Sequence, residues 1–315
     1  MLASVLFSAL TTAIFLPYRT CPQPSKHYDF RAALPRMDVE KGADWASAAA
    51  GLLRAPLPPT ADCALSPSDF CEAPAQGLIV LLRHGESEWN GAEPGSARFT
   101  GWHDVPLSTA GVQQAVDAAK VLQDHGVCVQ RVYTSTLKRT IKTAWTVLET
   151  LDAFTVPITQ SWRLNERMYG ALTGLNKVNT QLMLGDVQFE ELRRDPPPLD
   201  AGSCYDPSRR NAFRSVPPEM MPLKESFEDT RDRMLPCWQH EILPAAQVGE
   251  AVLVISSKNL LRTLLMSITD VPPEQLMQLD IENGVPLVYD PEARTLRRLE
   301  ADQRSSAWPA PSDSR

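Results

Sequence analysis

The sequence has no pair of closely spaced cysteines and only five histidines. Three of its six cysteines, Cys21, Cys63 and Cys71, lie toward the N-terminus, and the other three are far apart. Structural zinc sites use cysteine and histidine ligands at short, regular spacings. The sequence therefore excludes a zinc scaffold of this kind, predicts no metal, and favours a reducing compartment.

Basic residues are also in the minority. The chain has 31 Lys and Arg residues against 38 Asp and Glu residues, which gives a formal net charge of −7 at pH 7. A protein that binds nucleic acid needs a broad basic surface that neutralises phosphates. We therefore expect no nucleic-acid partner, and an anionic ligand must be bound by a local cluster of basic residues.

The sequence has no apolar run long enough to span a membrane comfortably. Residues 2–16 are apolar and small, whereas a membrane-spanning helix needs about 20 apolar residues. No acidic residue precedes Asp29, and the basic residues Arg19, Lys26 and Arg31 follow the apolar run. We interpret this start as a plastid or mitochondrial targeting sequence, with a cytoplasmic location as the alternative, and expect no membrane contact in the mature protein.

Composition divides the chain into three parts. Residues 1–76 are rich in Pro, Ala and Ser without a sustained period, which is typical of a removable or flexible extension. Residues 77–300 alternate apolar strands with amphipathic helices, which predicts one α/β catalytic domain of about 225 residues. Residues 301–315 are predicted to form a polar tail.

One predicted strand leads directly into candidate catalytic residues. The apolar run at residues 78–82 has no helical period, which predicts a strand buried on both faces. It ends at Arg83, His84 and Gly85, and ligands of α/β sheets bind beyond the carboxyl ends of the strands. A neutral imidazole can attack phosphorus while a guanidinium group holds phosphoryl oxygens. The alternative for a lone histidine is a structural role.

Two further strands are expected to bring charged residues to the same edge. A predicted strand at residues 127–133 is followed by a helix whose first turn contains Arg139, where backbone N–H groups favour an anion. Glu166 follows a predicted strand at residues 157–162, and a carboxyl group shielded from water suits general acid or base catalysis. For each of these residues alone, the alternative is an exposed surface charge.

A second continuous apolar run, at residues 251–255, predicts another buried strand. It is expected to deliver Ser257, Lys258 and Asn259 to the site before the next helix begins. Two more strands are predicted at residues 285–289 and 295–299.

The helices show recognisable start and break signals. Ser108 and Ser135 are expected to cap two helices, and a helix from residue 226 to residue 242 is expected to kink at Pro236. Residues 177–218 are predicted to form a helical stretch followed by an irregular Pro-rich excursion, which together make a candidate lid.

Five sequence blocks resemble the cofactor-dependent (2,3-bisphosphoglycerate-dependent) phosphoglycerate mutases of the histidine phosphatase superfamily. The blocks are residues 82–90, 98–102, 134–140, 164–172 and 284–289, and they follow the family's order. The resemblance implies a three-layer sandwich in which helices cover both faces of a mostly parallel central sheet. It also implies interconversion of 2- and 3-phosphoglycerate in glycolysis and gluconeogenesis, with 2,3-bisphosphoglycerate as the phosphoryl primer and no metal. Small-molecule phosphoglycerates are the implied partners, and a homo-oligomer is one alternative for the assembly.

The resemblance also assigns roles to individual positions. His84 matches the histidine that carries the phosphoryl group, Arg83 and Arg139 match phosphate-clamping arginines, and Glu166 matches the residue that moves the hydroxyl proton. The positions implied to bind substrate are Arg83, Gly85, Glu86, Ser87, Glu88, Trp89, Asn90, Thr100, Gly101, Arg139, Arg167, Met168, Tyr169, Lys177, Arg193, Arg194, Lys258 and Asn259.

One position departs from the family pattern. The family usually has a second histidine after its late strand, and Ser257 stands at that place. Loss of one preorganised donor costs on the order of 10² to 10³ in rate unless another group replaces it. We expect Lys258 to replace the charge or Ser257 to replace the hydrogen bond. The alternatives to a mutase are a phosphatase acting on a small phosphorylated metabolite and a catalytically impaired phosphate-binding relative.

Overall fold

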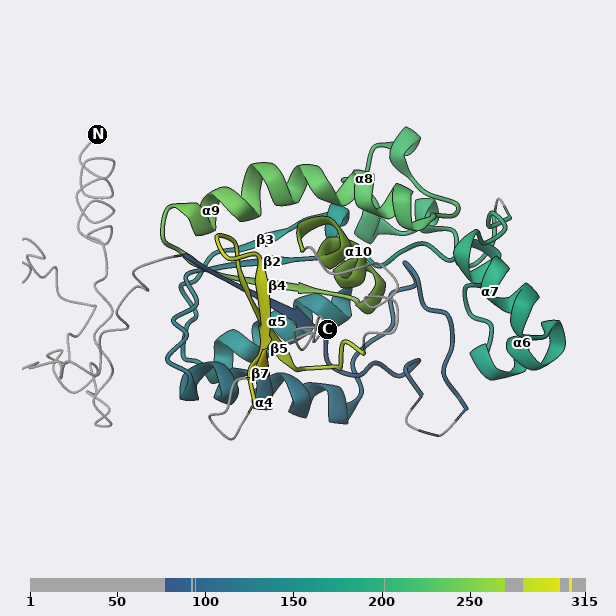
Figure 1. Ribbon diagram of the computed structural model, residues 1–315. Helices are drawn as coiled ribbons and strands as arrows, with labels where there is room; N and C mark the ends of the chain where they lie inside the picture. Colours follow the sequence, from purple (N-terminus) through teal and green to yellow (C-terminus); the bar gives the residue numbers. More distant parts are fainter. Residues whose placement is uncertain are drawn as a thin grey trace, which may run out of the picture. The chain divides into compact units, whose positions relative to one another are not determined.

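The computed structural model describes residues 77–91, 93, 95–200, 202–269, 280–300 and 306–307 (Figure 1). The predicted targeting extension, residues 1–76, lies outside the described residues, and so does most of the predicted polar tail. The division of the chain into three parts therefore stays a prediction. Across the described ranges, none of the helices combines the length and the apolar character needed to cross a bilayer.

A central sheet organises the domain, with strands in the order β3-β2-β4-β1-β5-β6-β7. The strands from β3 to β1 are parallel, and β5, β6 and β7 extend the sheet in antiparallel pairs. The bounds are β1 Leu78–Arg83, β2 Arg131–Thr134, β3 Ile158–Gln160, β4 Ala251–Ser256, β5 Pro286–Asp290, β6 Thr295–Arg298 and β7 Ser306–Ala307. The predicted α/β fold with a mostly parallel central sheet is confirmed.

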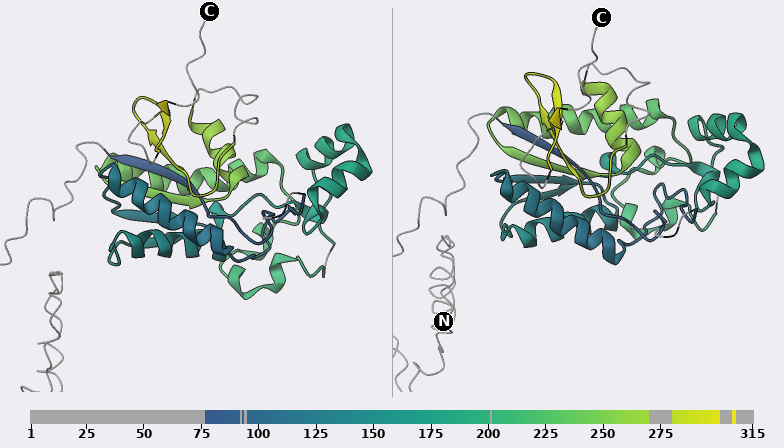
Figure 2. Two further views of the ribbon diagram at one scale, coloured as in Figure 1. Left: turned by 90° about the horizontal axis from the view of Figure 1, so that it is seen from below. Right: turned by 60° about the horizontal axis from the view of Figure 1, so that its bottom comes forward.

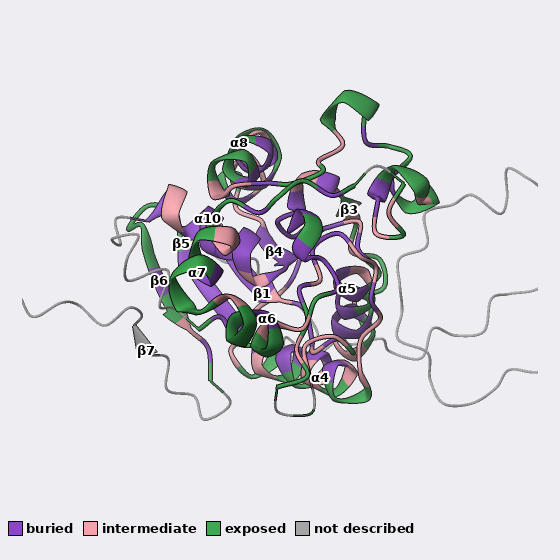
Figure 3. Cartoon of the chain, turned by 90° about the vertical axis from the view of Figure 1, so that its right-hand side faces the viewer, coloured by how far each residue is buried: buried purple, intermediate pink, exposed green. Residues whose placement is uncertain are grey.

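The two continuous apolar runs form the neighbouring strands β1 and β4. Leu82 pairs with Ile255 and Arg83 pairs with Ser256, so the two strands end side by side. All six residues of β4 are buried, because helices cover both faces and leave no face for polar residues. Figure 3 shows buried residues gathered along these strands.

Two groups of helices cover the sheet (Figures 1 and 2). Val80 and Leu82 pack in the cluster that includes residues of α4 (Thr109–Asp124) and α5 (Lys138–Thr150). Ile79 and Leu81 pack in the cluster on the other face. Successive residues of a strand point to opposite faces, so β1 contributes to both cores and the three-layer sandwich is confirmed. The helices that contribute to the second core are α8 Phe227–Cys237, α9 Leu243–Gln247 and α10 Lys258–Ile268.

Most element predictions hold, with shifted boundaries. Ser108 caps α4 by accepting from Gly111 N. Ser135 does not cap the next helix as its position predicts, because α5 begins at Lys138, after Leu137. The Ser135 hydroxyl bonds Thr140 Oγ1 at 2.6 Å and accepts from Leu137 N at 3.2 Å, so it stabilises the turn that precedes the helix.

Strand β2 begins later than the predicted residue 127. The side chain of Gln130 accepts from Ala251 N at 2.9 Å. Because this side-chain oxygen replaces a backbone acceptor, the regular pairing of the strand starts only at Arg131.

The helix predicted over residues 226–242 contains Pro236 within α8 and then widens into a π-helical turn at Trp238–Ile242. Leu243 N donates to Trp238 O, five residues earlier. Pro244 follows at once, and a proline in a helix clashes with the carbonyl four residues before it. A wider turn relieves such a clash. The main irregularity of this helix therefore lies at residues 238–242, after Pro236, where the kink is predicted.

The segment predicted as helical from Lys177 to Arg194 forms two helices. They are α6 (Lys177–Leu184) and α7 (Asp186–Arg194), and they stand at the end of the molecule to which β1 points (Figure 1). Gly185 separates them at φ 76°, a left-handed conformation that favours glycine.

Cys128 is disulfide-bonded, which the scattered cysteines of the sequence do not indicate. The reducing compartment stays a prediction. Cys204 and Cys237 are free thiols. A disulfide needs Cα atoms within about 7 Å of each other in space, and spacing along the sequence does not report that distance.

Candidate active site

A small cavity lies at the carboxyl ends of β1 and β4, where the sequence places its catalytic candidates. Its volume is about 60 Å³, far below the roughly 300 Å³ or more of a pocket for a drug-sized ligand. The cavity therefore suits a small group. It is lined by Arg83, His84, Ser87, Asn90, Arg98, Thr100, Arg139, Glu166, Tyr169, Lys177, Lys258 and Asn259.

His84 is held in one tautomer. Its Nδ1 lies 2.6 Å from Gly85 O, and a carbonyl oxygen only accepts, so Nδ1 carries the proton. The side chain is only 4% exposed, and burial lowers its pKa well below 6.5, aided by the positive charges of Arg139 and Arg83. The imidazole is thus neutral with a lone pair on Nε2, which is the nucleophilic form.

Arg139, in the first turn of α5, fixes the other side of this imidazole. Its Nε donates to Nε2 of His84 at 3.2 Å. Its Nη1 donates to His103 O and its Nη2 to Gly101 O, each at 3.0 Å. Burial lowers the pKa of Arg139 to about 10, so the guanidinium stays charged at neutral pH. Two backbone carbonyls therefore hold a cation beside the nucleophile.

Arg83 ends β1 and lines the same cavity. Its Nη1 donates to Ile281 O at 2.8 Å. Its Nε is buried and has no hydrogen-bond partner among the described residues. A buried unpaired donor is costly, and a phosphoryl oxygen in the cavity would satisfy it.

Glu166 reaches the cavity from a loop tied to two neighbours. Its Oε1 accepts from Arg167 N at 2.8 Å and its Oε2 from Asn259 N at 3.5 Å. The preceding Asn165 accepts from Thr136 N at 2.9 Å, which joins this loop to the end of β2. Glu166 is only 7% exposed. The carboxylate therefore sits in a fixed place among cations, as proton transfer to a bound ligand requires.

A buried ion pair supports the Glu166 loop from behind. Arg233 Nε donates to Glu225 Oε1 at 2.5 Å, and its Nη2 donates to the carbonyls of Asn165 and Glu166 at 2.9 and 3.0 Å. Glu225 Oε2 accepts from Met168 N at 2.8 Å. Neither Arg233 nor Glu225 lies in a recognisable motif, so the sequence alone does not point to this pair.

Arg98 and Lys177, the first residue of α6, also line the cavity. Arg98 Nη1 donates to Gly174 O at 2.9 Å, and Lys177 lies over the ring of Phe99 at 5.6 Å. Burial lowers the pKa of Lys177 to about 8. Arg98 is a site residue that was not among those predicted, although it belongs to the block at residues 98–102 that carries part of the resemblance.

The residues after β4 occupy the place where the family has its second histidine. Ser257 is buried, and its Oγ lies 3.4 Å from Arg139 Nη2. The ammonium group of Lys258 forms an ion pair with Asp280. Asn259 Nδ2 bonds the hydroxyl of Tyr169. Lys258 and Asn259 line the cavity together with His84.

Several predicted ligand residues lie outside the cavity lining. Glu86 Oε1 accepts from Ser108 Oγ at 2.7 Å, and Trp89 stacks on His103 with ring centroids 4.4 Å apart. A side chain at Gly85 would meet Gly111 O at 2.0 Å, so glycine is needed for close packing. The predicted residues away from the lining are Gly85, Glu86, Glu88, Trp89, Gly101, Arg167, Met168, Arg193 and Arg194. Their contact with a ligand stays a prediction.

Arg167 uses its guanidinium to bind the main chain at the end of α7. It donates to Arg193 O at 2.6 Å, to Arg194 O at 3.3 Å and to Glu225 O at 3.1 Å. Arg193 pairs with Glu190 at 2.7 Å. In this arrangement Arg167 anchors α7 beside the site.

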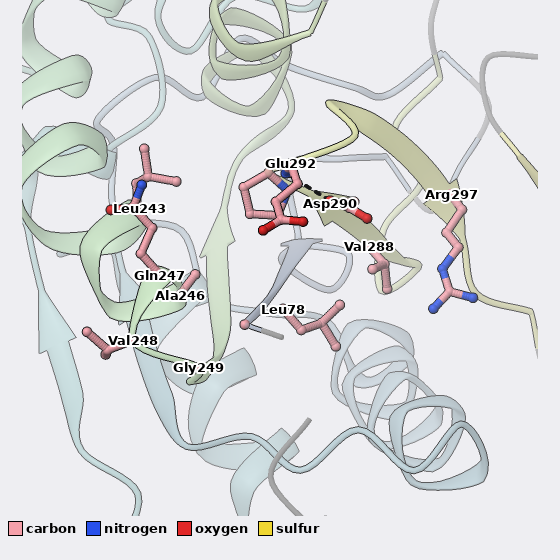
Figure 4. A pocket seen from close by; sticks show the side chains of 12 residues that line it. Leu78, Leu243, Ala246, Gln247, Val248, Gly249, Val288, Asp290, Glu292 and Arg297 are labelled. Atoms are coloured by element: carbon pink, nitrogen blue, oxygen red, sulfur yellow. Dashed lines mark hydrogen bonds between the residues drawn. The ribbon is translucent and has the colours of Figure 1, made fainter. Parts of the chain in front are cut away.

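A larger cavity of about 660 Å³ opens at the other end of the strands (Figure 4). It is lined by residues at the start of β1, around α9 and along β5 and β6, including Leu78, Gln247, Asp290 and Arg297. Neither a histidine nor a cysteine occurs among the described residues that line it. The smaller cavity, which holds His84, is therefore the candidate active site.

Known proteins share both the sequence pattern and the fold. A family model described as histidine phosphatase superfamily (branch 1) matches residues 79–206 and 204–301. The solved structure of YhfR from Bacillus stearothermophilus is 27% identical, with a TM-score of 0.50, and covers 68% of this chain and 90% of that chain.

Two further structures are more distant. A mycobacterial glucosyl-3-phosphoglycerate phosphatase is 21% identical, with a TM-score of 0.51, covering 68% of this chain and 91% of its own. A phosphoglycerate mutase from Bacillus anthracis is 24% identical, with a TM-score of 0.48, and the match covers 69% of this chain and 90% of that chain. The first of these likenesses concerns the fold alone, and the second is too weak to distinguish activities.

Proposed function

This chain belongs to the histidine phosphatase superfamily (branch 1), and we propose that it transfers phosphoryl groups through His84 and interconverts 2-phosphoglycerate and 3-phosphoglycerate. The observation that carries the proposal is the neutral imidazole whose Nε2 lone pair lies beside the Arg139 guanidinium, 3.2 Å away. A nucleophile and a cation at this separation are what attack on a phosphoryl group requires.

In the proposed reaction, His84 begins the cycle phosphorylated. The free hydroxyl of the phosphoglycerate gives its proton to the Glu166 carboxylate as its oxygen attacks phosphorus, and the N–P bond of His84 breaks, which leaves a bisphosphorylated glycerate. Nε2 of His84 then attacks the other phosphorus, the bond from that phosphorus to the ester oxygen breaks, and Glu166 returns the proton to the departing oxygen. Charge on the equatorial oxygens grows in each transition state, and the fixed guanidinium groups stabilise it without reorganising.

The charges of the cavity support a substrate with two anionic groups. Five cationic side chains line it against the single carboxylate of Glu166. The cations are Arg83, Arg98, Arg139, Lys177 and Lys258. A phosphoglycerate carries both a phosphate and a carboxylate, and guanidinium groups recognise each of these in a bidentate manner.

The charges of the residues that line the cavity also suit a bisphosphorylated primer. The unpaired Nε of Arg83 and the surplus of cations would hold its phosphates. Bound 2,3-bisphosphoglycerate would supply the phosphoryl group that His84 needs at the start of turnover.

A phosphatase acting on a small phosphorylated metabolite is the second candidate. The observation that favours it is Ser257, because its short side chain stands at the position where the family usually has a second histidine. A water molecule that attacks the phosphorylated His84 would release phosphate and complete a hydrolase cycle.

One assay separates these functions. The full chain is supplied with 3-phosphoglycerate, with and without 2,3-bisphosphoglycerate, and both 2-phosphoglycerate and free phosphate are followed, with His84→Asn as the control. Primer-dependent formation of 2-phosphoglycerate supports the mutase. Release of free phosphate without 2-phosphoglycerate rejects the mutase and supports the phosphatase. Absence of both products, with no phosphate mass on His84, rejects both enzymes and leaves a phosphate-binding relative.

A further inference from the structure

We infer that Asp280 is a positioning residue that holds the ammonium group of Lys258 against the transferring phosphoryl group. The Asp280–Lys258 pair would then supply the positive charge that related sequences take from a second histidine. This inference rests on the proposed phosphoryl transfer and adds a residue to it that the sequence did not point to.

The position of Lys258 in the fold supports this role. Lys258 is the first residue of α10, directly after β4, so its backbone lies at the same sheet edge as His84. Its side chain lines the cavity. A lysine side chain has four flexible carbons, and without a partner its ammonium group would sample many positions. The ion pair with Asp280 selects one of them.

The segment that contains Asp280 also holds two other groups of the site. Ile281 O accepts from Arg83 Nη1 at 2.8 Å. Asn283 Nδ2 donates to the backbone oxygen of His84 at 2.6 Å, and Gly284 N donates to Arg83 O at 3.0 Å. One short segment therefore fixes the nucleophile, a clamping arginine and Lys258 relative to one another.

Asp280 also balances the charges around Lys258. The charged groups that face this ammonium are Arg83, Arg262 and Asp280. Burial lowers the pKa of Lys258, the two arginines lower it further, and the hydrogen bond that its ammonium group donates to Asp280 raises it. Asp280 therefore offsets part of the repulsion among these three cations, and Glu166 offsets a further part at Arg83 and Arg262.

Ser257 is a weaker replacement for the missing histidine. Its hydroxyl is uncharged, and its contact with Arg139 Nη2 is long at 3.4 Å. Hydrogen bonds from charged donors are roughly twice as strong as neutral ones. The next residue, Lys258, is therefore the better source of transition-state stabilisation.

The test is a double-mutant cycle in the full chain with Lys258→Ala, Asp280→Asn and the double variant. The control is Glu282→Gln, which removes a neighbouring carboxylate that pairs with Arg298 outside the cavity. Single-turnover transfer from labelled 2,3-bisphosphoglycerate to His84 is measured alongside KM. We expect Lys258→Ala to slow transfer about 10²-fold, Asp280→Asn about tenfold, and the double variant to match Lys258→Ala. KM should change much less than the rate, and Glu282→Gln should behave as wild type.

Two results would overturn the inference and leave the proposed function intact. In one, the fold-loss of transfer rate in the double variant equals the product of the losses in the two single variants. In the other, Asp280→Asn transfers at the wild-type rate. If the wild-type protein transfers no phosphoryl group, the proposed function fails. The affinity of the wild type and the three variants for inorganic phosphate is then measured by calorimetry. Coupled losses of phosphate affinity then support the Asp280–Lys258 pair, and independent or absent losses reject it. Asp280→Glu, which keeps the charge, should recover part of the loss and excludes a general folding defect.

Discussion

The Nε of Arg139 donates a hydrogen bond to Nε2 of His84 across 3.2 Å. This contact holds the imidazole lone pair in a fixed direction, and the positive charge opposes protonation of the ring. The same guanidinium is anchored by two backbone carbonyls. One arginine therefore sets both the orientation and the protonation state of the proposed nucleophile.

Arg139→Lys should lower the rate of phosphoryl transfer by about 10² to 10³. Lysine keeps the charge but lacks the planar fork that bonds His84 and the carbonyls of Gly101 and His103 at the same time. The measurement is the rate at which labelled phosphate appears on His84. Lys138→Arg, a substitution at the exposed neighbouring position, serves as the control and should leave the rate unchanged. A wild-type rate in Arg139→Lys would show that the fork is dispensable.

Glu166→Gln should lower isomerisation by about 10² to 10⁴, the range of general acid–base catalysis. Glutamine keeps an acceptor for Arg167 N but cannot give a proton to the leaving oxygen. An aryl phosphate such as p-nitrophenyl phosphate has a leaving group that needs no proton. Formation of the phosphorylated protein from this compound should therefore fall far less. Equal losses with both compounds would assign Glu166 to positioning and remove it from proton transfer.

The stability of the protein should fall as pH drops below about 6.5, in part because of His84. The folded-state pKa of His84 lies well below 6.5, so the unfolded chain binds a proton there before the folded chain does. Below about pH 6.5 the unfolded state therefore binds more protons than the folded state. In this pH range the free energy of unfolding rises as the pH rises. One such group contributes at most about 1.4 kcal/mol per pH unit.

Urea unfolding of His84→Gln between pH 5 and 7.5 checks this effect. The variant should lose less stability than the wild type as pH falls, and above pH 7 their pH slopes should agree. His240→Gln, at an exposed histidine, should keep the wild-type slope. Parallel curves for the wild type and His84→Gln would mean that residue 84 is not buried in its neutral form.

Glu225→Gln should destabilise the fold by about 3 to 5 kcal/mol, since it breaks a buried ion pair and leaves Arg233 uncompensated. The two side chains are only 5% and 4% exposed. Activity at a temperature where the variant is folded should also fall, because Arg233 supports the carbonyls of Asn165 and Glu166. The matched control is Asp117→Asn, which breaks an exposed pair with Lys120 and should cost less than about 1 kcal/mol. Similar losses in the two variants, measured by chemical denaturation, would contradict the structural role of the buried pair.

The sequence by itself determined the framework of the domain. Strands β1 and β4 lie where their unbroken apolar runs predicted, because a strand covered on both faces must be apolar at every position. His84 and Lys258 lie at one edge because parallel neighbours end at the same side of a sheet. Ser108 caps its helix because a local hydrogen bond to the third following residue decides that start.

Only the tertiary structure decided which groups meet at that edge. Segments that are far apart in the chain meet in these contacts. Backbone carbonyls anchor Arg139, Arg167 holds α7, and Arg233 and Lys258 form ion pairs with carboxylates outside their own helices. The surroundings of His84 in the folded chain likewise fix its tautomer. Asn283 and His84, for example, are 199 residues apart. Such contacts depend on how loops pack over the ends of strands, and no local pattern of residues encodes that packing.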